Sequence, residues 1–444
     1  MRRLLPAVLA AVAAITAGLA APAAAHVVPA TTIELDVHEK DITATLTLPS
    51  ADLGTASGIT LVEGQMDAAT AAAVADYLTA HVAVTGAAGA WQVVVADVAA
   101  SDTEQWGTGV FPAVTATATL TPPDASDLRD FTLAYDAIIH RVITADIYVT
   151  LHSDWAAGET DSARDLGTIT VDTVTGTIPT LHIDLDDGSP WQGFVGMVTL
   201  GISHIAEGTD HQLFLLTLLL PAPLLAIRGR WRGVAPPRRA VRRITAITIA
   251  FTAGHSLTLA LGALGLPVPQ QPVEALIAVS ILVAALHAIR PLFPGREPIV
   301  AGAFGLVHGM AFSTTLAALD LSGWPLVLSL LGFNIGIELM QLFVVLLVLP
   351  PLVVLARTRG YAPLRVTAAV VTGLAAVGWL VDRLGMTNPL GTAADSIGAA
   401  SPWLVAALWI ACAAVLARRG ARRDAAAPPA PADLPETSRV GSGG

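Results

Sequence analysis

Ionisable side chains stand directly before one of the most apolar stretches of the chain. The segment "GISHIAEGTDHQLFLLTLLL", residues 201–220, carries His204, Asp210 and His211 and then runs into leucines. Ionisable groups at membrane depth cost several kcal/mol unless they are paired, hydrated or used. Imidazole nitrogen and carboxylate oxygen together suit zinc, nickel, cobalt or iron, and they also suit a proton relay. The segment therefore predicts a metal site or a proton pathway.

Further ionisable residues lie in or beside the apolar segments that follow. In chain order they are His255, Glu274, His287, His308 and Glu338. Glu338 shares a helical face with Asn334 and Gln341. Any one of these histidines alone is more often a hydrogen-bonded packing residue. As a set, however, they gather in the first five apolar segments and avoid the last two. We therefore expect all of them to join His204, Asp210 and His211 as candidate metal ligands in one intramembrane site or pathway.

The composition divides the chain into two parts that suit different solvents. Of its 444 residues, 54% are hydrophobic and 13% are charged, and the mean hydropathy is +0.65. These values exclude a single soluble domain and indicate a membrane protein. Between His26 and Pro190 there are 24 acidic and 4 basic residues, whereas after Pro190 there are 11 acidic residues and 18 arginines. The acidic part lacks the clustered basic residues that phosphate contacts need, so nucleic acid is not an expected partner.

The first 25 residues have the features of a secretory signal peptide. Arg2 and Arg3 precede an apolar stretch, and small residues at 23–25 fit a cleavage site. Cleavage there would make His26 the amino terminus, whose α-amino and ring nitrogens could chelate copper or nickel. An ordinary terminus left by processing is the simpler expectation.

Residues 26–188 are predicted to form an extracytoplasmic, mainly β domain. Apolar and polar residues alternate in "TTIELDVHEKDITATLTLPS" around a turn, which is typical of a hairpin. Similar strand-like segments follow, and residues 67–81 have helical spacing instead. We expect a sandwich-like β domain with one helix, followed by a short acidic linker.

Residues 189–420 are predicted to form a polytopic helical domain. After an opening apolar stretch at 191–227, runs long enough for spanning helices lie at about 243–264, 272–290, 298–319, 324–355, 365–381 and 401–417. Arginine-rich loops alternate with neutral or acidic loops, as the positive-inside rule requires. This pattern predicts about seven spans in the plasma (inner) membrane, with the amino-terminal domain outside and the carboxyl terminus cytoplasmic. Residues 421–444, rich in Pro, Ala and Gly, are expected to form a disordered cytoplasmic tail.

The first span is predicted to be interrupted at Gly208. A single helix from 191 to 227 would be about 55 Å long, against a hydrocarbon core of about 30 Å. "TDHQ" fits a capping box with Thr209 as N-cap and Gln212 three residues later. We therefore expect a short helix near 191–206 and a spanning helix from Thr209. The alternative is one long tilted helix.

The spacing His-x5-Asp-His in "HIAEGTDH" resembles that of the HupE/UreJ family, which is named for accessory proteins of hydrogenase and urease operons. The resemblance covers the membrane half, about 191–420. A signal peptide followed by a large outer domain is similar to the long-form branch of the family. The resemblance implies nickel or cobalt permeation, with metal-ligand roles for His204, Asp210 and His211.

A second family motif, Phe-His-Gly-x-Ala-x-Glu, aligns with "VHGMAFS", residues 307–313. His308, Gly309 and Ala311 match the motif. Val307 stands in place of its Phe, and Ser313 stands in place of its Glu.

Three functions fit these observations. The first is a permease for a divalent transition metal such as nickel, cobalt or zinc. We expect such a protein to be no enzyme and to hold no tightly bound cofactor. Its expected partners are the lipid bilayer and the ion, and a homo-oligomer is compatible with this function. The second is an intramembrane zinc-dependent hydrolase, because Ser203 and Ser256 adjoin histidines. The third is a non-catalytic membrane scaffold or sensor. Cys412 is the single cysteine, so an intramolecular disulfide is impossible.

Overall fold

A computed structural model describes residues 29–425, except 63, 106, 107, 125–127, 161, 265, 267 and 387, and omits the side chains of 392–399 and 420–425. The predicted signal peptide, His26 and the tail beyond residue 425 lie outside the described residues. The chain forms two compact units. One comprises the chain up to Met197 together with Ala318–Ser329, and the other comprises Val198–Ala317 and the chain from Leu330 onward.

The first unit is mainly β and contains two sheets. The six strands of the larger sheet are, in spatial order, β5 (Gln92–Gln105), β6 (Gly109–Thr121), β2 (Ile42–Pro49), β1 (Thr31–Val37), β8 (Ile147–Asp154) and β9 (Arg164–Ile169). The strands pair in antiparallel fashion except β1 and β8, which are parallel. The predicted hairpin is confirmed, since Val37 of β1 pairs with Ile42 of β2.

The smaller sheet and two helices complete this unit. The sheet has the order β10 (Leu181–Asp184), β7 (Asp130–Tyr135), β3 (Val82–Gly86) and β4 (Gly89–Ala90). The predicted helix is α3 (Ala68–His81), which begins where Asp67 accepts a hydrogen bond from the Thr70 amide. The pattern did not predict α2 (Ser50–Ser57), a short helix that Gly58 ends with a positive φ.

Alternating side chains of the two sheets share one hydrophobic core, as a sandwich-like domain requires. Leu35 and Leu46 of the larger sheet and Leu133 of the smaller sheet are each almost fully buried in it. A buried ion pair adds to the core, because Arg129 donates two hydrogen bonds to Asp154, whose side chain is 1% exposed.

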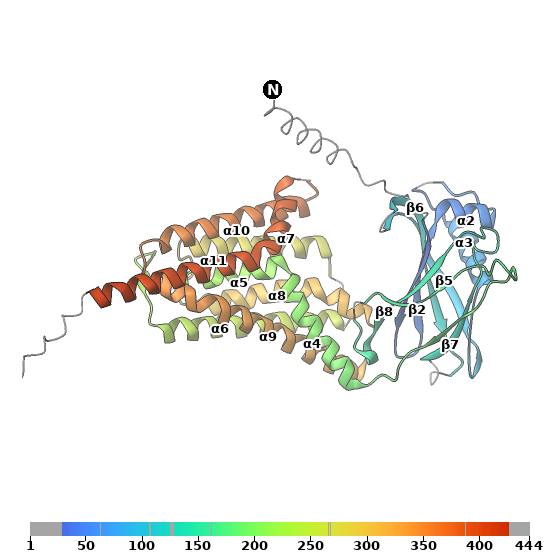
Figure 1. Cartoon of the computed structure of the whole chain (residues 1–444), viewed down its shortest axis with the longest axis horizontal. Helices are drawn as coiled ribbons and strands as arrows, with labels where there is room; N and C mark the ends of the chain where they lie inside the picture. Colours follow the sequence, from blue (N-terminus) through green and yellow to red (C-terminus); the bar gives the residue numbers. More distant parts are fainter. Residues whose placement is uncertain are drawn as a thin grey trace, which may run out of the picture. The chain divides into compact units, whose positions relative to one another are not determined.

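The second unit is a helical bundle. Its elements are α4 (Pro190–Glu207), α5 (Thr209–Leu219), β11 (Leu224–Ile227), β12 (Arg230–Val234), α6 (Pro237–Ala263), α7 (Gln270–Ile289), α8 (Glu297–Ala318), α9 (Gly323–Leu355), α10 (Tyr361–Arg383) and α11 (Pro389–Ala425). The first residues of α4 and α9 and the last residue of α8 belong to the first unit. The long helices run along a common direction (Figure 1). Leucines, isoleucines and phenylalanines of α5, α6, α7 and α9 form its core.

Among the described residues, the six helices α6 to α11 are long and apolar enough to cross a membrane. They coincide with the six predicted runs after the opening stretch. The expected count of about seven included a spanning helix from Thr209, whereas α5 ends at Leu219 after 11 residues. In addition, α11 continues to Ala425, so the first residues of the predicted tail are helical.

The chain between α5 and α6 forms a hairpin that the sequence did not predict. Strands β11 and β12 pair through residues 224–234, which include part of the arginine-rich loop. Trp231 of this hairpin donates a hydrogen bond to the main-chain oxygen of His287 at 2.8 Å, and Arg243 lies over its ring. These contacts hold the hairpin against α7.

Candidate metal centre

The break between α4 and α5 brings His204 and His211 together. Helix α4 ends at Glu207, Gly208 is extended with φ −66° and ψ 94°, and α5 begins at Thr209. The predicted break is therefore confirmed, but the capping box is wrong. Gly208 is the N-cap, and the side-chain amide of Gln212 donates to the main-chain oxygen of Ala206 instead. A Cβ at Gly208 would collide with the main-chain oxygen of His204, so glycine permits this tight connection.

Four histidines from four helices meet beside this break. They are His204 of α4, His211 of α5, His255 of α6 and His308 of α8. The ring of His211 lies 4.6 Å from that of His204, 6.4 Å from that of His255 and 5.0 Å from that of His308, between ring centroids. His255 and His308 are 0% and 1% exposed, and His211 is 7% exposed.

Small residues let α6 and α8 approach closely enough to align two of these histidines. A Cβ at Gly305 would collide with the main-chain oxygen of Phe251, and a Cβ at Gly309 would collide with that of His255. Close main-chain packing of this kind is common between membrane helices. It places His308 of α8 at the same level of the bundle as His255 of α6.

Hydrogen bonds fix which nitrogen of His211 and His308 is free. The carboxylate of Asp210 accepts the proton on Nδ1 of His211 at 2.9 Å. The hydroxyl of Ser280 donates to the main-chain oxygen of Ile277, so it accepts the proton on Nε2 of His308, at 2.9 Å. In the neutral rings the lone pairs are therefore on Nε2 of His211 and Nδ1 of His308.

The nitrogens left free have no hydrogen-bond partner among the described residues. They are Nε2 of His204, Nε2 of His211, both ring nitrogens of His255 and Nδ1 of His308. A buried polar atom without a partner costs about 1–3 kcal/mol, so several in one place indicate a ligand that supplies the missing contacts.

Two groups of three residues have the spacing of a metal site. Ligand atoms of His204, His211 and His255 all lie within 4.8 Å of one another, as do those of Asp210, His211 and His308. Imidazole and carboxylate ligands in this number suit a borderline divalent cation such as zinc, nickel or cobalt. Because Asp210 contacts Nδ1 of His211, it can also act from outside the ligand shell by orienting that ring, as carboxylates often do at metal-bound histidines.

Aromatic side chains surround the cluster on its apolar sides. Phe312 lies 4.4 Å from the His204 ring and stacks on Phe333 at 4.5 Å, and Phe251 and Phe214 each lie 5.3 Å from the His308 ring. Such a shell excludes water, which strengthens electrostatic contacts at the site.

A polar pocket of about 310 Å³ adjoins the cluster at the end of the bundle where α5 begins. Glu207, Asp210 and Glu274 are among its lining residues. Glu274, a predicted ligand, lies in this pocket rather than in the cluster, and it pairs with Arg383 at 3.0 Å. Asp210 belongs to both the pocket and the cluster, so it connects the two.

The structure also places His287 away from the cluster. Its Nδ1 accepts a hydrogen bond from the Leu292 amide at 3.1 Å, and its ring stacks on Phe293 at 3.9 Å. Glu297 lies 3.9 Å from its Nε2 and pairs with Arg243 at 2.5 Å. These contacts indicate a structural role at the end of α7 next to the hairpin.

Glu338 lines a different space from the four histidines. It lies in a groove of about 440 Å³ between α6 and α9, together with Thr252 and Asn334. The residue that continues its helical face, Gln341, lies instead in a narrow pocket next to His211. Ser280, which sets the His308 ring, was not singled out from the sequence, although it is a hydroxyl residue within an apolar run.

Fold and cluster together define a polytopic helical membrane protein with a cluster of histidines beside a carboxylate, joined to a sandwich-like β domain. Residues 181–383, which include α4 to α10, match the family model described as HupE / UreJ protein. The helical part of the chain therefore belongs to the HupE/UreJ family. No curated protein and no solved structure matches the chain.

Proposed function

We propose that this protein is a membrane permease for a divalent transition metal of the nickel or cobalt type. The observation that carries the proposal is the set of buried, unpartnered imidazole nitrogens on four helices. The cluster would bind the ion as cargo, through His204, His211 and His255 or through Asp210, His211 and His308. Membership of the HupE/UreJ family supports a role in nickel or cobalt transport rather than catalysis.

The polar pocket beside Asp210 would form one entrance to the cluster. Its acidic residues attract a cation, and Asp210 lies within reach of both the pocket and His211. The charge pattern of the loops supports an extracytoplasmic position for this end of α5, because the arginine-rich segments lie at the opposite ends of α6 and α7. An interrupted helix at such a site is typical of transporters.

The Asp210 carboxylate also offsets the positive end of the α5 helix dipole. The amino end of a helix carries a partial positive charge, which disfavours a cation near the start of α5. Asp210 lies in the first turn of α5 and offsets that charge.

The contacts of Ser256 favour transport over hydrolysis. Ser256 adjoins His255, but its hydroxyl donates hydrogen bonds to the main-chain oxygen of Thr252 and to Oδ1 of Asn334 rather than to a histidine.

Metal flux into proteoliposomes tests the proposal. The full chain should admit Co²⁺ or Ni²⁺ faster than empty liposomes, and a His204→Ala/His211→Ala variant should lose this flux because it lacks ligands from both groups. His182→Ala provides a matched control, since His182 is an exposed histidine of the β domain. Equal flux in the wild type and the double variant would contradict a permease built on this cluster and would favour a scaffold or sensor.

A further inference from the structure

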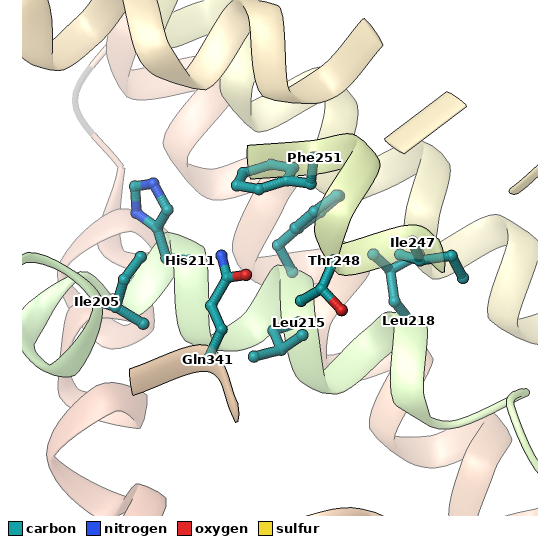
Figure 2. Close-up of a pocket in the computed structure, with 9 residues that line it drawn as sticks. Ile205, His211, Leu215, Leu218, Ile247, Thr248, Phe251 and Gln341 are labelled. Atoms are coloured by element: carbon teal, nitrogen blue, oxygen red, sulfur yellow. The ribbon is translucent and has the colours of Figure 1, made fainter. Parts of the chain in front are cut away.

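A narrow, mostly apolar throat lies next to His211, on the side away from the polar pocket. It is formed by residues of α4, α5, α6 and α9 (Figure 2). The free space within it is about 10 Å³. A single water needs about 10–15 Å³ of such space. A hydrated metal ion therefore cannot enter the throat with its water shell.

Three polar side chains, His211, Thr248 and Gln341, interrupt the apolar lining of this throat (Figure 2). Gln341 of α9 is 4% exposed, and its Oε1 is buried without a hydrogen-bond partner among the described residues. An amide oxygen left unpaired in an apolar site costs about 1–3 kcal/mol. Packing of α9 does not explain this cost, because an apolar side chain of similar length would fill the same space.

Thr248 supplies a second oxygen. Its hydroxyl donates to the main-chain oxygen of Ile244 at 2.7 Å, which leaves its own lone pairs available as acceptors. The remaining lining residues, among them Phe214, Leu218 and Phe251, offer no donor atom for a cation. The throat thus holds two neutral oxygen ligands beyond the nitrogen ligands of the cluster.

We infer that Gln341, together with Thr248, forms a second cation-binding site, which receives the dehydrated ion from the histidine cluster. The inference rests on the proposed permease function. Neutral oxygen atoms replace part of the lost water shell, yet they hold a nickel or cobalt ion less tightly than imidazole nitrogens do. Conduction requires sites that are favourable enough to enter and weak enough to leave.

Flux and equilibrium binding measured on the same full-length variants test this step. Gln341→Leu and Thr248→Val remove the oxygens while keeping the size of the side chains, and Gln341→Met keeps the length with a weakly ligating sulfur. Asn334→Leu provides the control, because it makes the same kind of change on α9 at a residue that lines the groove rather than the throat. Co²⁺ flux is measured in proteoliposomes, and Co²⁺ affinity is measured by calorimetry in detergent.

We expect Gln341→Leu to lower the flux roughly tenfold or more, while Co²⁺ affinity at the cluster stays within about twofold of wild type. Unchanged affinity also shows that the variant is folded. Wild-type flux in Gln341→Leu would overturn the inference and leave the permease proposal intact. A parallel loss of affinity would also overturn it, because Gln341 would then act through the cluster. No flux in the wild type would overturn both proposals.

Discussion

Asp210 and His211, adjacent in the chain, are joined by a side-chain hydrogen bond of 2.9 Å between Oδ1 and Nδ1. The same carboxylate oxygen accepts the His211 main-chain amide at 2.8 Å. His211 is a member of both groups of candidate ligands, and its bond to Asp210 through Nδ1 leaves its Nε2 free. One acidic residue in the first turn of α5 therefore orients the central ring of the cluster.

Asp210→Asn should weaken Co²⁺ binding by about 10–100-fold, the usual effect of removing a carboxylate that orients a metal-bound histidine. The amide oxygen can still accept the Nδ1 proton, but the negative charge is lost. Calorimetry and the ligand-field absorption of bound Co²⁺ measure the change. Glu207→Gln, which removes another carboxylate from the same pocket, should alter the affinity less. Equal effects of the two substitutions would show that only the charge of the pocket matters.

Ser280→Ala should weaken Co²⁺ binding several-fold because it frees the Nε2 proton of His308 from its acceptor. The ring can then take the other tautomer, in which Nδ1 is protonated and cannot bind metal. Ser329→Ala is the matched control, since Ser329 is also fully buried and its hydroxyl bonds only to a main-chain oxygen of its own helix among the described residues. Unaltered affinity in Ser280→Ala would remove His308 from the ligand set.

Gly305→Ala should destabilise the bundle by about 1–3 kcal/mol, since the added Cβ must push α8 away from the main chain of α6. Thermal unfolding in detergent measures this loss, and Co²⁺ affinity should fall with it as His308 moves away from His255. Gly360→Ala should have little effect, because Gly360 has an ordinary φ of −75° and open space around its Cα. Similar melting temperatures for both variants would show that the two helices do not require glycine there.

Arg129→Met should destabilise the β domain by about 3–5 kcal/mol, the typical result of leaving a buried charge without its partner. The Asp154 carboxylate is 1% exposed and loses two hydrogen bonds in this variant. Arg141→Met, at an exposed arginine of the same domain, serves for comparison. Urea unfolding followed by tryptophan fluorescence gives both values, and a loss below about 1 kcal/mol for Arg129→Met would mean that water reaches Asp154.

The stability that Asp67 gives to α3 should depend on pH. Hydrogen bonds from Thr70 lower the pKa of the Asp67 carboxyl below its ordinary value of 3.8. Because the folded-state pKa is depressed, this contribution is complete above pH 3.8 and is lost as the pH falls through the lower, folded-state value. Asp67→Ala should therefore lower the melting temperature of the domain at pH 7, and the difference from wild type should narrow in stronger acid. An equal difference at both pH values would rule out the charged cap.

Sequence patterns alone predicted the two kinds of structure, the six long apolar helices and the break at Gly208. Hydrophobicity over about 20 residues and alternation in strands are local properties, and a glycine before "TDHQ" interrupts a helix through local main-chain geometry. The eight candidate ligands were also visible, because ionisable residues in apolar helices are rare. The cap at Gly208, helix α2 and the β11–β12 hairpin were missed, since competing local hydrogen bonds and tertiary contacts decide them.

Only the tertiary structure decided which of those eight residues meet. Three of them have the same residue types and similar neighbours in sequence as the others but lie outside the cluster. Glu274 pairs with Arg383, His287 lies near Glu297, and Glu338 lines the groove between α6 and α9. Close packing at Gly305 and Gly309 sets the level of His308 against His255, and Ser280 sets its tautomer. These are contacts between helices distant in sequence, so the periodicity of any single segment carries no information about them.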